Sequence, residues 1–244
     1  SAVNKTFLTS DYSNEGNPVL FISYRNTAGL ESYWNYHSHD IGRAGVGAVN
    51  DFTGNLVFSR TEMSFSGTRL PVTIQRIYNA NEKDTNTGYG YGWHLNYAQK
   101  IQEVTLSGDT YYSWKDEDAT VHYFKKSGTQ PYKDEDGLDL KLMVQASGNK
   151  YIIEDKTGGK LEFDTNGRLV KTTSKQTLNS QITIEYTGTT DKVSRIVDGA
   201  GRVYTFSYNA QGLANTLNYY GTGSTALESL QFAYDSNSNL TGAT

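Results

Sequence analysis

Two histidines and an aspartate lie close together near the start of the chain, as His37, His39 and Asp40. In an extended segment alternate residues point to the same side, so both imidazoles could ligate one metal ion. The alternative, which we favour, is that they hydrogen-bond within an aromatic-rich loop. His94 and His122 are isolated in the sequence, and would need the fold to bring further ligands to them. We therefore predict no metal ion and no other cofactor.

Two acidic triplets, 116–118 and 134–136, could supply paired carboxylates. Glycoside hydrolysis needs two carboxyl groups held across a cleft, so a hydrolase predicts that the triplets converge. Turn chemistry explains them better, because each triplet lies between expected strands, where solvated acids are common. Calcium binding by the clustered oxygens is a further alternative.

Two aromatic clusters could form a carbohydrate-binding surface, because exposed Trp and Tyr rings stack against sugars. The clusters are Tyr33, Trp34 and Tyr36, and Tyr89, Tyr91 and Trp93. The alternative is that tyrosines line the interior of a sheet and that Gly90 and Gly92 let the backbone turn beside Trp93. A binding or adhesion module for cell-wall or other polysaccharide is thus our second functional hypothesis.

Motifs of the common enzyme classes are missing from the sequence. It contains no nucleophile elbow, phosphate-binding loop, dinucleotide fingerprint or zinc-protease motif, and it has no cysteine. Acidic and basic residues are mixed, with a net charge of −4, so no basic patch is available for a phosphate backbone. We predict that the chain is not an enzyme and does not bind nucleic acid.

The composition predicts an all-β fold. The 244 residues include 24 Gly and 19 Tyr but only 3 Pro, which is typical of short strands joined by glycine turns. No window places apolar residues at helical spacing, so we expect little helix. Apolar runs such as 19–22 are far shorter than the roughly 20 residues that span a bilayer.

Period-two alternation locates the strands. It begins after residue 49 and is clear where Leu70, Val72, Ile74, Arg76 and Tyr78 share one face. Before it we expect one strand at 19–22 and then an irregular loop. The further predicted strands, separated by polar turns, are 95–106, 110–114, 120–124, 138–145, 150–154 and 160–163. This order predicts an antiparallel β-meander.

The last third of the chain repeats itself. Strand patterns at 182–186, 203–208 and 230–234 each end in tyrosine, and these tyrosines lie 22 and 26 residues apart. Acidic or amide residues and glycines follow, and we expect them to form hairpin turns, because the side chain caps backbone amides and glycine takes positive φ. The predicted turn residues are Asp164, Gly167, Arg168, Asp198, Gly201, Arg202, Asn209, Gly212 and Asp235.

These repeats, above all 163–169 and 198–208, resemble the YD repeats of Rhs proteins, wall-associated proteins and teneurins. Upstream, 42–50, 53–57 and 70–72, and then 78–79 and 90–93, are similar to the segment that precedes the repeats in Gram-positive members. The resemblance implies a β-strip that spirals into a hollow shell, commonly around a C-terminal toxin or variable domain. Segment 234–239 departs from the pattern because it lacks the usual Gly-Arg.

The resemblance suggests three segments: an irregular, aromatic-rich part at 1–48, the β-region that precedes the repeats at 49–155, and YD-type hairpin repeats at 156–244, in an array expected to continue. We expect a non-catalytic shell module of a large secreted or cell-surface protein, located outside the cell or at its wall. Its expected partners are further YD repeats and a C-terminal domain of the same polypeptide.

Overall fold

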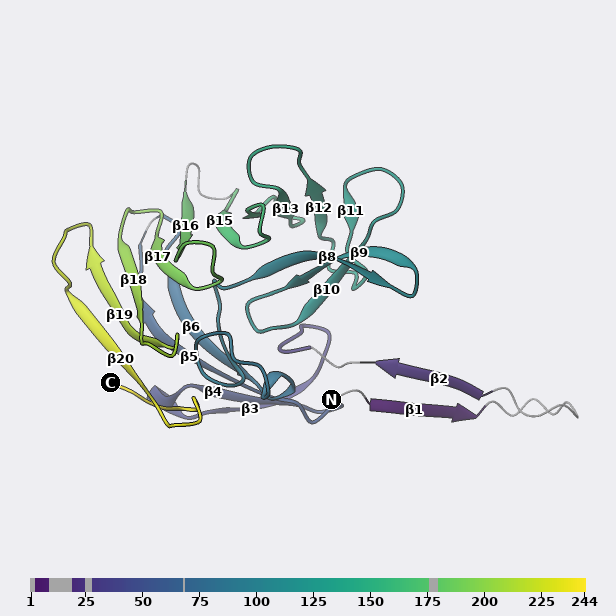
Figure 1. The fold of residues 1–244 in the computed structure, drawn as a ribbon, viewed down its shortest axis with the longest axis horizontal. Coiled ribbons are helices and arrows are strands. Elements are labelled where there is room, and N and C mark those ends of the chain that lie inside the picture. The colour runs from purple at the N-terminus through teal and green to yellow at the C-terminus, as the bar shows by residue number, and fades with distance from the viewer. Residues whose placement is uncertain (1–2, 9–18, 25–27, 68, 176–179) are drawn as a thin grey trace, which may run out of the picture.

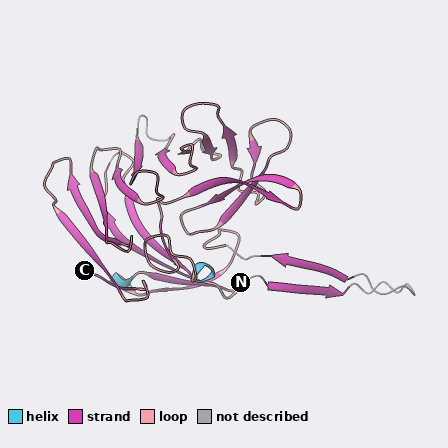
Figure 2. Ribbon diagram, in the orientation of Figure 1, coloured by secondary structure: helices cyan, strands magenta, loops and turns pink. Residues whose placement is uncertain are grey.

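The computed structural model describes residues 3–8, 19–24, 28–67, 69–175 and 180–244. Within them the chain consists of antiparallel strands and two short 3-10 helices, η1 Gly42–Ala44 and η2 Ala80–Glu82 (Figure 1 and Figure 2). Strand order in every sheet follows chain order. The predicted all-β meander of hairpins is therefore confirmed.

Three sheets are formed by the first ten strands. A two-stranded sheet pairs β1 Val3–Leu8 with β2 Val19–Tyr24. A five-stranded sheet, here called the leading sheet, contains β3 Tyr36–Asp40, β4 Val46–Asn50, β5 Leu56–Ser64, β6 Thr73–Asn79 and β7 Trp93–Leu95. A three-stranded sheet contains β8 Lys100–Leu106, β9 Asp109–Lys115 and β10 Val121–Lys125.

One 11-stranded sheet, here called the repeat sheet, follows. The predicted division after residue 155 falls inside it, between β13 and β14. Its strands are β11 Tyr132–Lys133, β12 Lys141–Val144, β13 Tyr151–Glu154, β14 Lys160–Phe163, β15 Leu169–Thr173, β16 Gln181–Tyr186, β17 Val193–Val197, β18 Val203–Tyr208, β19 Ala214–Gly221, β20 Glu228–Tyr234 and β21 Leu240–Ala243.

Two expectations about the early strands are wrong. We expected an irregular loop after 19–22, but β3 pairs there with β4. Because β3 is an edge strand with residues 37–40 exposed, it lacks the alternation that reveals a strand. The predicted strand 95–106 is interrupted after Leu95, where the Asn96 side chain accepts from the Gln75 amide and donates to the Thr73 carbonyl.

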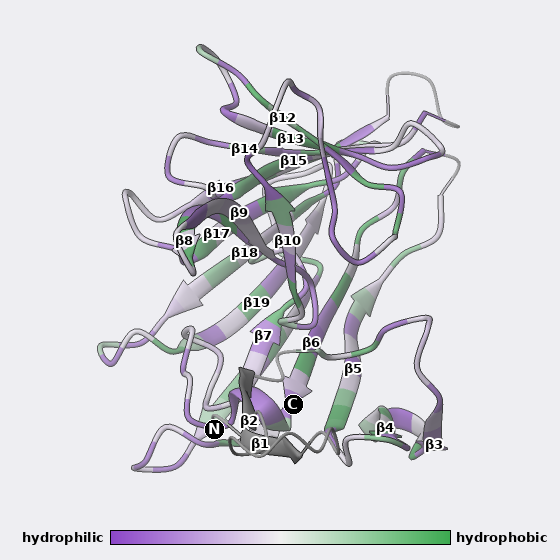
Figure 3. Ribbon diagram, turned by 90° about the vertical axis from the view of Figure 1, so that its right-hand side faces the viewer, coloured by the Kyte–Doolittle hydropathy of each residue, from purple (hydrophilic) through white to green (hydrophobic). Residues whose placement is uncertain are grey.

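Alternation of buried and exposed side chains explains how the sheets pack. Figure 3 shows hydrophobic and hydrophilic residues alternating along strands such as β6 and β19. In β16, Ile182 and Ile184 are buried, whereas Gln181 and Glu185 are exposed. The leading sheet and the repeat sheet therefore each have an apolar face that must be covered.

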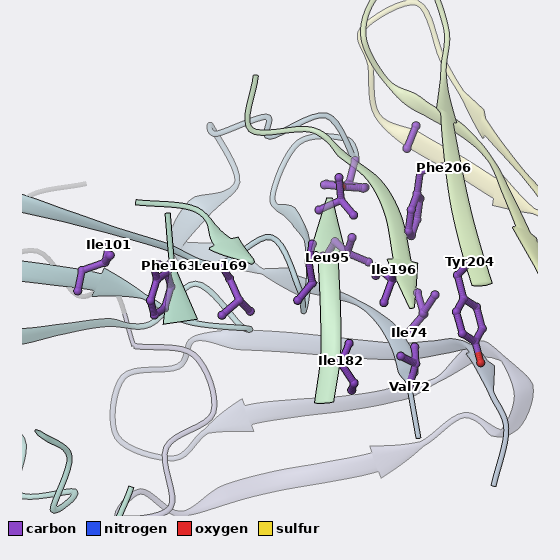
Figure 4. Close-up of a cluster of buried hydrophobic side chains, with 14 of the residues drawn as sticks. Val72, Ile74, Leu95, Ile101, Phe163, Leu169, Ile182, Ile196, Tyr204 and Phe206 are labelled. Atoms are coloured by element: carbon purple, nitrogen blue, oxygen red, sulfur yellow. The ribbon is translucent and has the colours of Figure 1, made fainter. Parts of the chain in front are cut away.

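The leading sheet covers the apolar face of the repeat sheet. Val72, Ile74 and Leu95 belong to the same buried cluster as Ile182 and Ile196, and Figure 4 shows these side chains facing one another. Figure 1 shows the repeat strands curving beside β5 and β6. The two sheets thus share one core. In the described part of the chain, no helix is long and apolar enough to span a membrane.

One ion pair is buried at this contact. Arg76 donates from Nε to Glu62 Oε1 at 2.7 Å, and both side chains are at most 2% exposed. The Arg76 guanidinium also lies 4.1 Å from the ring centroid of Phe232 in β20. Burial lowers the pKa of Arg76, and the Glu62 carboxylate opposes this shift.

Replacing Glu62 by Gln should lower the free energy of unfolding by about 3 to 5 kcal/mol, because it leaves a buried guanidinium without its counter-charge. The matched control is Glu185→Gln, which breaks the exposed pair with Arg195 and should cost less than about 1 kcal/mol. Urea unfolding measures both. Equal losses in the two variants would show that the Arg76 pair is not buried as described.

Candidate functional site

The predicted repeat turns are closed by their acidic residues. Asp198 Oδ1 accepts the amides of Ala200 and Arg202 at 2.9 Å each, and Oδ2 accepts from Arg202 Nε at 2.5 Å. Gly201 has φ of 81°, in the left-handed region. Asp164, Asn209 and Asp235 likewise accept a backbone amide four residues on. Hydrogen bonds between residues at most four apart thus close each of these hairpin turns.

The side chain of Arg202 also forms hydrogen bonds outside its own turn. Arg202 Nη1 and Nη2 donate to the carbonyls of Ser66 and Phe65 at 3.1 Å each, across more than 130 residues. The Gly199 amide donates to the Leu70 carbonyl at 3.1 Å. Phe65, Ser66 and Leu70 lie between β5 and β6 in the chain, so these contacts, here called the seam, fasten the leading sheet to the repeat sheet.

The turn at Gly167 docks on β8 in the same way. The Ile101 amide donates to the Gly167 carbonyl at 2.8 Å, and the approach is so close that a Cβ at Gly167 would lie 1.9 Å from Ile101 O. Arg168 Nη1 donates to the carbonyls of Gly188 and Thr190 at 3.0 and 2.7 Å. Glycine and arginine therefore place this turn against its neighbours.

A tyrosine ladder runs along the repeats. The hydroxyls of Tyr186, Tyr208 and Tyr234 donate to the carbonyls of Leu169, Val193 and Ala214 at 2.7 to 2.8 Å. Each hydroxyl crosses to an earlier strand of the sheet. Burial raises the pKa of all three phenols. The regular 22- and 26-residue spacing marked these tyrosines in the sequence, but it did not reveal their bonds.

A second group of polar residues gathers around His122 on β10. Its Nδ1 lies 2.8 Å from Asp136 Oδ2, and its Nε2 lies 3.3 Å from Asp116 Oδ2 and 3.5 Å from Glu31 Oε1. The ring packs against Trp114, with centroids 4.9 Å apart. We call these four ionisable residues the His122 cluster.

Local and long-range hydrogen bonds together hold the His122 cluster in place. Asp116 Oδ1 accepts the amides of Asp118 and Thr120, which leaves Oδ2 free to face the imidazole. The Leu30 amide donates to Asp118 Oδ2 at 2.5 Å and brings Glu31 to the hairpin across 88 residues. Glu31 was not recognised in the sequence, because no local pattern marks it.

The electrostatics of the His122 cluster follow from its burial. His122 is 2% exposed. Burial lowers its pKa, but hydrogen bonds to Asp116 and Asp136 outweigh this effect and raise the pKa to about 10. Burial raises the pKa of Asp116 above its usual range and also raises that of Glu31. The imidazole and the carboxylates therefore strongly influence one another.

The three residues considered as possible metal ligands in the sequence lie away from the His122 cluster. His37, His39 and Asp40 are all exposed on β3, and His37 Nδ1 pairs with Asp51 Oδ1 at 2.5 Å. Among the described residues, the one group that could hold a metal consists of Glu31, Asp116 and His122. His94, the other isolated histidine, is buried beside Lys115, and burial lowers its pKa to about 4.

The acidic triplets take part in turns, and one residue of each also reaches His122. Asp116 and Asp134 accept backbone amides within their own turns, as turn chemistry requires. The triplets lie on separate loops, yet Asp116 and Asp136 meet at His122. Two carboxylates on opposite sides of a buried imidazole do not face each other across a cleft, so they do not form the pair that glycoside hydrolysis needs.

The two aromatic clusters differ in exposure. Tyr33 is 53% exposed, and Trp34 stacks on Phe52, which is 75% exposed. Tyr36 is half-buried, and its hydroxyl donates to the Gly29 carbonyl. In the other cluster Tyr89 is fully buried, Trp93 packs on Tyr78 and Phe58, and Tyr91 is 41% exposed. Tyr89 is therefore unable to contact a sugar.

Comparison with known proteins gives distant relatives. A family model described as a domain of unknown function (DUF6531) matches residues 47–124. The chain is 25% identical over 213 residues to the tRNA3(Ser)-specific nuclease WapA of Bacillus spizizenii, covering 84% of the chain and 8% of that protein. It is 26% identical over 181 residues to the tRNA nuclease WapA of Bacillus subtilis strain 168, covering 74% and 6%.

These similarities are compatible with the wall-associated YD-repeat family that the repeats resemble. The chain spans less than a tenth of the length of these relatives. One expectation is contradicted: we predicted that the protein is not an enzyme, whereas these relatives are named as nucleases. The prediction rested on the absence of motifs, which says little about proteins of which the chain represents only a small part.

Asp198→Ala should lower the free energy of unfolding by about 3 kcal/mol, because it leaves two amides and the Arg202 side chain without their acceptor. Asp235→Ala is the matched control, because Asp235 also accepts the backbone amides two and four residues on but pairs with no arginine. This variant should lower the free energy of unfolding by about 1 kcal/mol. Urea unfolding of both variants tests the difference. A loss at Asp198 no larger than at Asp235 would mean that the Asp198–Arg202 ion pair adds no stability.

Proposed function

We propose that this chain forms the first part of a YD-repeat shell in a secreted or wall-attached, toxin-like protein, and that the leading sheet closes the end of that shell. The observation that carries the proposal is the shared core: the leading sheet fills the inner side of the curved repeat sheet. Hairpins are marginal alone, so the first repeats of an array need such a cover.

The far edge of the repeat sheet supports continuation of the array. In the described part of the chain β21 pairs with β20 alone. An open strand edge of this kind is a template for another strand. A further repeat of the same polypeptide is the partner that we propose for this edge.

The relatives supply the proposed role of the whole protein. Their names state cleavage of tRNA. In our proposal that activity belongs to a longer polypeptide, whose toxin segment is enclosed by the shell that this chain begins. The hydrogen bonds of the seam would then limit how often the end of the shell opens.

Weakening the seam in the full-length protein should expose the enclosed segment to protease. Arg202→Ala removes the bonds to Ser66 and Phe65, and we expect segments downstream of residue 244 to be cleaved at least several times faster than in the wild type. Arg195→Ala, which removes an exposed arginine of the neighbouring β17, should leave the rate unchanged. Limited proteolysis followed by mass spectrometry measures this, and equal rates in all three proteins would contradict an enclosing shell.

Carbohydrate binding is a second candidate, favoured by the exposed Tyr33 and Phe52 and by the half-buried Trp34 that stacks on Phe52. Phe52→Ala should then reduce retention of the chain on cell-wall polysaccharide by about tenfold, because a stacked ring contributes roughly 1 kcal/mol or more. Tyr91→Ala is the control from the other cluster. Co-sedimentation measures retention, and equal retention of wild type and Phe52→Ala would exclude this surface.

A further inference from the structure

The His122 cluster is not used by the seam or by the repeat turns, although it is one of the most buried polar groups in the chain. Glu31 and His122 are 6% and 2% exposed. One ligand atom each from Glu31, Asp116 and His122 lies within 4.8 Å of the other two. Imidazole and carboxylate are both donors that zinc accepts.

Two of the three separations between these atoms match those around a tetrahedral ion, and the third, between the carboxylates of Glu31 and Asp116, is no more than 4.8 Å. Ligands at roughly 2.0 to 2.1 Å from zinc are separated by about 3.3 to 3.4 Å along the edges of the tetrahedron. His122 Nε2 lies 3.3 Å from Asp116 Oδ2 and 3.5 Å from Glu31 Oε1. A small inward movement of Glu31 would complete three corners and leave the fourth to a water molecule.

The other ring nitrogen has the partner that a metal-binding histidine needs. Metal-ligating histidines usually donate their second N–H to a carboxylate, which fixes the tautomer and the orientation of the ring. His122 Nδ1 lies 2.8 Å from Asp136 Oδ2. This contact directs Nε2 towards Asp116 and Glu31.

The charge of the surroundings supplies an independent reason. Three acidic residues, Glu31, Asp116 and Asp136, surround a single imidazole, and a fourth, Asp118, acts electrostatically on Glu31. Among the ion pairs of the described residues, none joins a lysine or arginine to any of these four. One imidazolium balances only one of these carboxylates, whereas a divalent ion that displaces the proton from His122 Nε2 would balance two.

We propose that Glu31, Asp116 and His122 bind a divalent transition-metal ion of the zinc class, with Asp136 as the residue that positions the imidazole. An imidazole ligand disfavours calcium and magnesium, which prefer all-oxygen sites. The ion would fasten the segment around Glu31 to the β9–β10 hairpin, more than 80 residues away in the chain.

The test is titration of the chelator-stripped 244-residue chain with zinc chloride. Calorimetry should show saturable binding of one ion per chain, and the thermal midpoint should rise relative to the chelated protein. Glu31→Gln and Asp116→Asn should each abolish saturable binding or weaken it at least tenfold, and Asp136→Asn should weaken it about 10 to 100-fold. Excess calcium should not compete.

The control is the double variant His37→Ala/His39→Ala, which removes the exposed histidine pair and should bind zinc like the wild type. The fluorescence of Trp114 reports metal binding without substitution of any metal ligand, because its ring centroid lies 4.9 Å from that of His122. Added Cu²⁺ or Co²⁺ should quench its fluorescence, measured as the difference from Trp114→Phe. No saturable binding, binding lost only in the double variant, or no quenching of Trp114 would overturn the proposal.

Discussion

Ile74 and Leu95 of the leading sheet, together with Val72 directly before β6, enter the same buried cluster as Ile182 and Ile196 of the repeat sheet. A meander of hairpins has one face that water would solvate poorly, and a curved open sheet is unable to cover that face with its own strands. The leading sheet solves this problem at the start of the array. The seam and the buried Arg76–Glu62 pair lie at this same contact between the two sheets.

Hydrogen bonds join the same segments that the apolar core packs together. Each Asp-x-x-Gly-Arg turn satisfies its own amides through the aspartate, while Arg168 and Arg202 reach carbonyls of neighbouring segments. The tyrosine ladder makes the corresponding bonds within the sheet. Local turn chemistry and long-range attachment are therefore carried by the same repeated residues. Because the same residue types recur in each repeat, the repeat pattern can be recognised in the sequence.

Features encoded within a few residues could be predicted from the sequence, and those created by distant contacts could not. Hairpins and their turn residues follow from alternation and from Asp-Gly chemistry. The partner of Arg202 lies more than 130 residues away, and Glu31 meets a hairpin that begins nearly 80 residues later, so no local signal announces either. The His-x-His pair that looked like a metal site is exposed, whereas the isolated His122 gains its neighbours only through folding.

Native-state hydrogen exchange across increasing urea tests most directly whether the two sheets form one cooperative core. If they do, the amides of β6 in the leading sheet and of β17 in the repeat sheet will exchange through openings of equal free energy that decrease together with urea. If β6 keeps its protection after β17 has exchanged completely, or the reverse, the sheets unfold separately. That result would contradict the shared core on which the closed end of the shell depends.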